Sequence, residues 1–195
     1  MGKGDVVIMM FRTHEIGGLV ACTAAMPLFI NSGIMPEPDV LTYGLFFAGG
    51  AMGAMFPDID SPTSKIRRGI RKLFTGDPST EKRVINHRRE PHMPLIWAVI
   101  FAICLFMISN PLAETFIWGM IIGVASHLFL DMLNPAGIPL FGPFKRKKIN
   151  ILPIKTNSWG ENIIAILLVF LEIYLLFFSN IGIINVIDIV DKLVV

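Results

Sequence analysis

Hydrophobic residues in this chain arrive in five long blocks separated by polar stretches. Four of the blocks contain no charged residue, and they cover residues 16–36, 40–57, 93–112 and 115–130. The fifth block, residues 163–178, contains one charge, Glu172. A helix of about 20 apolar residues spans the hydrocarbon core of a bilayer. The pattern therefore predicts an all-α, polytopic membrane protein with about five transmembrane helices.

The whole chain, residues 1–195, is expected to form a single integral membrane domain. Two long loops, residues 58–92 and 134–161, connect its helices. Residues 181–195 are apolar but include three charges, which predicts a short interfacial or partly buried tail helix. No cleavable signal peptide is evident, because the first block lacks a clean small-residue cleavage site. The spans are expected at about residues 16–34, 40–57, 93–110, 115–133 and 162–179.

Composition agrees with this class of protein. Charged residues make up 16% of the chain, against about 25% in a typical soluble domain. Cys22 and Cys104 lie inside apolar blocks without CxxC spacing, so they are expected to behave as small hydrophobic residues. Membrane lipid is the expected surrounding partner, and no nucleic-acid partner is expected.

The distribution of basic residues predicts the orientation in the membrane. With five spans, the N-terminus and both long loops share one side, and 16 of the 17 Lys and Arg residues fall there. The opposite loops, residues 31–39 and 109–115, contain acidic residues and no basic ones. Because loops rich in Lys and Arg stay cytoplasmic, we expect an inner (cytoplasmic) membrane protein with its N-terminus inside and its C-terminus outside.

The longest polar stretch, residues 61–90, alternates apolar and basic residues. Ile66, Ile70 and Leu73 are interleaved with five Lys and Arg residues, among them Arg68. This pattern is typical of an amphipathic basic helix that lies on the inner leaflet.

Histidines and aspartates gather at the predicted cytoplasmic ends of the spans. His127 and Asp131 are four residues apart and therefore share a helix face. Glu161 lies at the same level, and Glu172 shares its helix face, but no role is assigned to either. Ionisable residues at membrane depth are costly and often functional, so we predict a metal site where the helix ends converge. The candidate ligands are His14, Asp58, Asp60, His87, His92, His127 and Asp131.

A mixed set of histidines and carboxylates suits zinc, with manganese or iron as alternatives, better than calcium or magnesium alone. Seven candidate ligands are too many for one tetrahedral ion but suit two, about 3.5–4 Å apart, which together activate water and clamp a phosphate ester. Asp60 or His92 would serve either as a further ligand or as the general base. Arg68, Arg88 and Arg89 are candidates for neutralising a substrate phosphate.

Each of these features also has a purely structural interpretation. A single histidine near a membrane interface is often a hydrogen-bonded structural residue, and His127 with Asp131 would also stabilise a helix as a pair. Asp58 and Asp60 fit a solvated turn or a helix cap equally well. Arg88 and Arg89 fit ordinary positive-inside charges.

Five motifs follow one another along the chain: His14 with Gly17-Gly18, Phe56-Pro57-Asp58-Ile59-Asp60-Ser61-Pro62, His87-Arg88 with His92, His127 with Asp131, and residues 134–143. In this order they resemble the YdjM-like family of inner-membrane metal-dependent hydrolases over about residues 12–165. The family is distantly similar to zinc-dependent phospholipase C and single-strand nucleases, which share a His-x-x-x-Asp helix. This similarity implies phosphoester hydrolysis and the seven ligand positions. The chain departs from the family pattern at Pro91-His92-Met93, where Thr-His-Ser is usual, and at Asn134, where Thr is common.

The sequence thus predicts a membrane-bound metal-dependent hydrolase that cleaves a phosphoester in a lipid or lipid-linked substrate. Two alternatives belong to other classes. One is a structural or regulatory membrane protein that binds metal without turnover. The other is a metal-ion transporter, which the almost wholly apolar outer halves of the spans disfavour.

Overall fold

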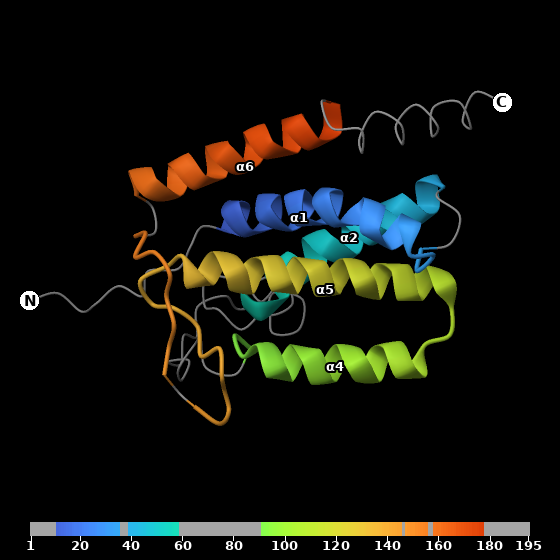
Figure 1. Cartoon of the computed structure of the whole chain (residues 1–195), viewed down its shortest axis with the longest axis horizontal. Helices are drawn as coiled ribbons and strands as arrows, with labels where there is room; N and C mark the ends of the chain where they lie inside the picture. The colour runs from blue at the N-terminus through green and yellow to red at the C-terminus, as the bar shows by residue number, and fades with distance from the viewer. Residues whose placement is uncertain (1–10, 36–38, 59–90, 146, 156–157, 178–195) are drawn as a thin grey trace, which may run out of the picture.

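The computed structural model describes residues 11–35, 39–58, 91–145, 147–155 and 158–177, and this part of the chain is all-helical (Figure 1). The predicted polytopic, all-α class is confirmed. A 3-10 turn, η1, extends the second helix over Phe56–Asp58. The five α-helices are α1 (Phe11–Asn31), α2 (Val40–Met55), α4 (Pro94–Met107), α5 (Pro111–Met132) and α6 (Trp159–Phe177).

Four of these helices are long and apolar enough to cross a membrane, and α4 is shorter. With 14 residues it is about 21 Å long, against about 30 Å for a bilayer core. It ends at Met107 because Pro111 begins α5, and Asn110 caps that helix by accepting from the backbone N–H groups of Leu112 and Ala113. In α1 the described helix already covers Phe11 to Glu15, ahead of the predicted span, so the polar residues Arg12, Thr13 and His14 are helical.

The helices form a central group of three with one helix on either side. Figure 1 shows α1, α2 and α5 together in the centre, with α4 beside α5 and α6 beside α1. Consecutive helices run in alternating directions. As a result, the start of α1, the end of α2, the start of α4, the end of α5 and the start of α6 all lie at one end of the bundle.

Four glycines bring α2 and α5 into backbone contact. A Cβ atom added at Gly49 or Gly53 of α2 would collide with the backbone of Phe116 or Met120. A Cβ at Gly119 or Gly123 of α5 would collide with the backbone of α2 in the same way. Small residues permit such approach between membrane helices. We call these four residues the glycine seam.

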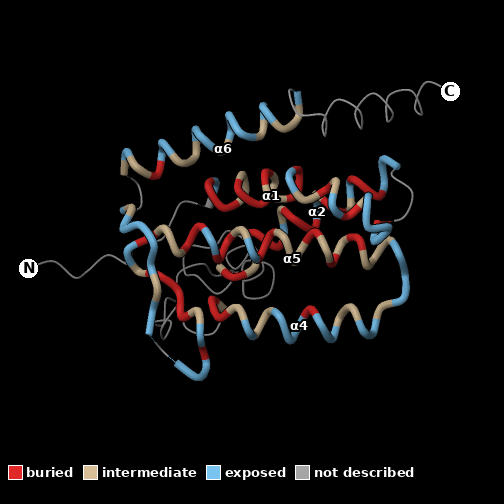
Figure 2. The backbone as a smooth tube through the Cα atoms, in the orientation of Figure 1, coloured by how far each residue is buried: buried red, intermediate tan, exposed pale blue. Residues whose placement is uncertain are grey.

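Burial separates the central helices from the outer two. Figure 2 shows buried residues concentrated on α1, α2 and α5, whereas α4 and α6 are mostly exposed. Their exposed residues are large and apolar, as in Phe106 at 91% and Phe170 at 64%. Exposed apolar surface of this extent suits helices that face lipid.

The segment after α5 folds back over the polar end of the bundle. The backbone N–H of Ile151 donates to the Met132 carbonyl at 2.7 Å, and Ile138 pairs with Ile149 as an isolated antiparallel bridge. Gly137 permits this turn: its φ is 56°, and a side chain there would strike the Ile149 backbone. This segment therefore closes the end of the bundle to which the histidines belong.

Candidate metal centre

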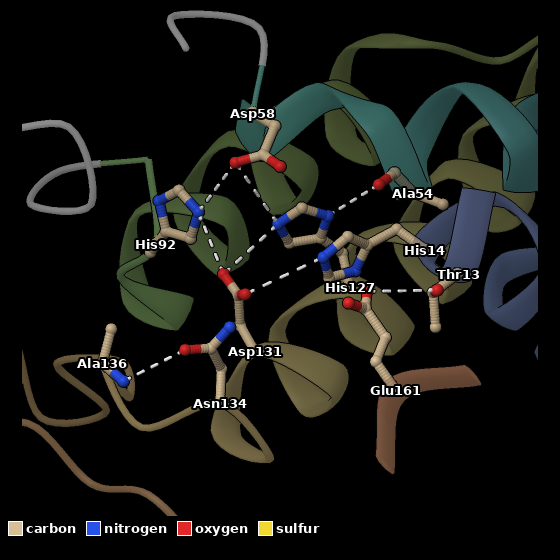
Figure 3. Close-up of polar contacts among 10 residues, drawn as sticks. All are labelled: Thr13, His14, Ala54, Asp58, His92, His127, Asp131, Asn134, Ala136 and Glu161. Atoms are coloured by element: carbon tan, nitrogen blue, oxygen red, sulfur yellow. Dashed lines mark hydrogen bonds and ion pairs between the residues drawn. The ribbon is translucent and has the colours of Figure 1, made fainter. Parts of the chain in front are cut away.

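Five of the seven predicted ligands lie in the described residues, and the structure brings all five together (Figure 3). They come from four different parts of the chain, since α5 supplies two. His92 is fully buried, and His14 and Asp131 are each 1% exposed, whereas Asp58 is the most accessible at 13%. The five are His14 of α1, Asp58 of η1, His92 before α4, and His127 and Asp131 of α5.

The glycine seam fixes the orientation of His127. Its Nδ1 lies 2.7 Å from the carbonyl oxygen of Ala54, one residue beyond Gly53 on the facing helix. A carbonyl accepts but cannot donate, so Nδ1 carries the proton and, in the neutral ring, Nε2 keeps its lone pair. That Nε2 faces Asp58 and Asp131. A histidine held in this way by a backbone carbonyl is the usual arrangement for a metal ligand.

Asp131 lies at the centre of the cluster. One carboxylate oxygen, Oδ2, is 3.1 Å from His92 Nε2 and 3.5 Å from His127 Nε2. The other, Oδ1, is 3.8 Å from His14 Nε2. One carboxylate therefore contacts three imidazoles from three different parts of the chain.

Asp58 completes the cluster from the opposite side. Its Oδ1 lies 3.3 Å from His92 Nε2 and 4.0 Å from His127 Nε2. The 3-10 turn that follows α2 places it there, and the glycine seam sets the position of α2 against α5. Asp58, His92 and His127 thus form one triad, and His14, His127 and Asp131 form a second, with ligand atoms within 4.8 Å of one another in each.

The spacing of these atoms fits a metal ion without rearrangement of the helices. Ligands bound tetrahedrally to zinc at about 2.0–2.1 Å lie roughly 3.3 Å from one another. The Nε2-to-carboxylate distances of 3.1–4.0 Å cover this value. The His14 and His127 rings are also stacked, with centroids 3.9 Å apart. Two overlapping buried triads of this kind can hold one or two ions.

The electrostatics of His92 reflect its two acidic neighbours. This residue precedes α4 and lies outside the apolar helices. Burial acts to lower its pKa, but hydrogen bonds to Asp131 and Asp58, with the charges of both carboxylates, raise the pKa of His92 to about 9. In the metal-free protein His92 therefore holds a proton at neutral pH, and a metal ion would have to displace it.

Further polar side chains, fully buried, surround the cluster. Thr13, the residue before His14, donates from Oγ1 to Glu161 Oε1 at 3.3 Å, as Figure 3 shows. Asn134 Oδ1 accepts from the backbone N–H of Ala136 at 3.1 Å, which holds the turn after α5. Sequence reasoning assigned no role to Glu161 and did not select Thr13. The signal for Thr13 was its position next to His14 at a helix end.

The other predicted site residues lie outside the described residues. They are Asp60, His87, Arg68, Arg88 and Arg89, together with the predicted amphipathic segment 61–90 and the predicted tail helix 181–195. Their proposed roles stay predictions.

The chain is similar to proteins from three bacteria. It is 33% identical over 156 residues to the uncharacterized protein YvsG of Bacillus subtilis (strain 168), and the match covers 80% of this chain and 87% of YvsG. It is 34% identical over 110 residues to the inner membrane protein YdjM of Escherichia coli (strain K12), and equally to that of Shigella flexneri. The latter matches cover 53% of this chain and about half the length of those relatives.

No solved structure shows significant similarity to the chain. The family described as YdjM inner membrane protein matches residues 9–187, nearly the whole sequence. The relatives' printed names state no activity. With its apolar helices and this match, the chain is a multi-pass inner membrane protein that belongs to the YdjM family.

Proposed function

We propose that this protein is a membrane-bound, metal-dependent hydrolase that cleaves a phosphoester. The observation that supports this most strongly is the buried convergence of three imidazoles and two carboxylates at one end of the bundle. Burying two carboxylates beside a membrane is costly unless a cation compensates them. Zinc fits this donor set best, with manganese or iron as alternatives.

The chain's own residues would divide the work as follows. His14, His127 and Asp131 would hold one ion. Asp58 and His92 would bind either the same ion or, together with His127, a second ion. A divalent cation bound there supplies Lewis acidity and lowers the pKa of a water molecule. Whichever of Asp60 and His92 is not a ligand would accept the proton of that water, and His92 could do so only after a bound cation has displaced its own proton.

Substrate binding would depend on the basic residues of the long loop. Asp58 is the most accessible of the five ligands, so a substrate would approach from the side of η1, where that loop begins. Arg68, Arg88 and Arg89 belong to the loop and would neutralise the phosphate. The same surplus of basic residues supports a cytoplasm-facing site.

Orientation can be tested with a reporter fused to the C-terminus. The proposal expects activity from a periplasmic reporter such as alkaline phosphatase, and silence from a reporter that fluoresces only in the cytoplasm. The opposite pattern would refute five spans with the N-terminus inside.

A metal site without turnover is the second candidate, and the near-complete burial of His127 and Asp131 favours it. Turnover separates the two. Purified protein should hydrolyse a phosphodiester such as bis(p-nitrophenyl) phosphate or a phospholipid, and His127→Ala/Asp131→Ala should lose that activity at least about 1000-fold. If the metal-loaded protein cleaves none of a broad panel of phosphoesters, the hydrolase proposal fails and a metal site without turnover is supported.

A further inference from the structure

An apolar groove lies between α4 and α5, next to the metal centre. Its volume is about 610 Å³, within the usual range for small-molecule sites. Trp97, Phe101 and Leu105 line it from α4. Val124 and Leu128 line it from α5, and Ile138 closes one end. The Trp97 indole is the one polar group in this lining, and its Nε1 donates to the Pro91 carbonyl at 2.6 Å.

The groove exists because α4 packs on α5 through side chains and not through backbone. Phe101 of α4 packs in one buried cluster with Val124 and Leu128 of α5, and the Trp97 ring stacks on Phe101 along α4 with centroids 5.8 Å apart. The small side chains of Ala98 and Ala102 on α4 and of Ala125 on α5 leave space between the two helices that the described residues do not fill. This arrangement contrasts with the glycine seam on the other side of α5.

The groove and the metal centre use the same turns of the chain. Pro94, at one end of the groove, is two residues after His92. Leu128 and Met132 in the groove directly follow His127 and Asp131 on α5. The apolar groove therefore begins at the level of the ligands and continues along the membrane-spanning part of α5.

An empty apolar space of this size beside lipid is readily filled by a hydrocarbon chain. Inside a bilayer such filling gains little from the hydrophobic effect, because lipid tails are as apolar as the groove. Its consequence is positional: a lipid whose tail occupies the groove has its headgroup held at the metal centre. Positioning of this kind raises the rate at a reacting bond.

We propose that the groove binds one acyl chain of a phospholipid and thereby presents the phosphoester of that lipid to the metal centre. The substrate part of this inference rests on the hydrolase function proposed above. Binding of the chain does not, so the two can be tested separately.

Two matched pairs of substitutions provide the test. Ala98→Phe/Ala102→Phe places two rings in the groove from successive turns of α4. Val99→Phe/Ile103→Phe adds the same rings one residue further along, at positions that are 52% and 54% exposed and do not line the groove. Both pairs should keep wild-type metal content, because neither touches a candidate ligand.

Binding is measured by photo-crosslinking in nanodiscs with phosphatidylglycerol that carries a diazirine in one acyl chain. Peptides that span residues 97–105 and 121–132 should be labelled in the wild type. The groove-filling pair should lose that label at least about tenfold, and the outward pair should keep it. Equal labelling of the two pairs would overturn the inference.

Turnover gives the second readout. The groove-filling pair should lower kcat/KM for a long-chain phospholipid about tenfold while leaving a short-chain, water-soluble phosphodiester unchanged. An equal loss on both substrates would overturn positioning by the groove. If the wild type cleaves neither substrate, the proposed hydrolase function fails, and the crosslinking result still decides whether the groove binds a chain.

Discussion

The two sides of α5 are packed in opposite ways. Against α2, the glycine seam brings backbone to backbone, and His127 reaches across to the Ala54 carbonyl. Against α4, packing is through side chains such as Phe101 and Leu128, and a groove of about 610 Å³ lies between the two helices. The same helix thus has one closely packed side and one loosely packed side.

The difference indicates how a small membrane protein can hold a polar site and still admit an amphiphile. Close backbone packing places Asp58, at the end of α2, within 4.0 Å of His127 on α5. Metal ligation requires such positions to be held to within about 0.5 Å. Loose packing costs some stability but leaves room for a chain. If the two sides of α5 have these separate roles, substitutions on the α2 side and on the α4 side should differ in which property they change and in how large the change is.

The largest effect is expected in the glycine seam. Gly49→Leu should destabilise the protein by about 3 kcal/mol or more and should also reduce metal binding, because the added side chain must push α5 away. Gly44→Leu is the matched control on the same helix, since nothing lies within 4 Å of a Cβ there. It should change stability by less than about 1 kcal/mol. Thermal unfolding in detergent measures the stability of both variants. Equal losses of stability would contradict the claim that the glycine seam holds α2 and α5 together.

Proton competition should give the next largest effect. Since the pKa of His92 is raised to about 9 in the metal-free protein, metal binding must release its proton at any lower pH. Apparent zinc affinity should therefore rise about tenfold per pH unit between roughly pH 7 and 9 from this group alone. In His92→Ala the affinity should be lower and this slope should flatten. Competition titrations with a chelator of known pH dependence measure the apparent zinc affinity. An unchanged slope in His92→Ala would contradict the assignment of this pH dependence to the His92 proton.

A smaller effect is expected where side chains support the ligands from behind. Glu161→Gln should weaken zinc binding by no more than about tenfold, because it alters the hydrogen-bond partner of Thr13, the residue before His14, and not a candidate ligand. Glu114→Gln, at the opposite end of α5, should leave zinc affinity at the wild-type value. A loss above about 100-fold in Glu161→Gln would instead indicate that Glu161 binds the metal directly.

Much of this organisation could be predicted from the sequence because membranes impose simple periodic constraints. Charge-free blocks identified the helices, and counting them placed His14, Asp58, His92, His127 and Asp131 at one level. These signals are local, so one sequence is enough to detect them.

Other features depend on which helices pack against each other, and the local patterns of a single sequence do not show those pairings. The Ala54 carbonyl that orients His127 is a backbone group, so its residue type gives no signal. The groove arises from the combined shapes of α4, α5 and the Ile138 turn.

The most direct test of the central claim is the metal content of the purified protein by elemental analysis. The account predicts about one to two zinc, manganese or iron ions per chain in the wild type. It also predicts that His127→Ala/Asp131→Ala loses them while remaining folded by circular dichroism. A wild-type protein without tightly bound metal, or a double variant that keeps its metal, would contradict the account.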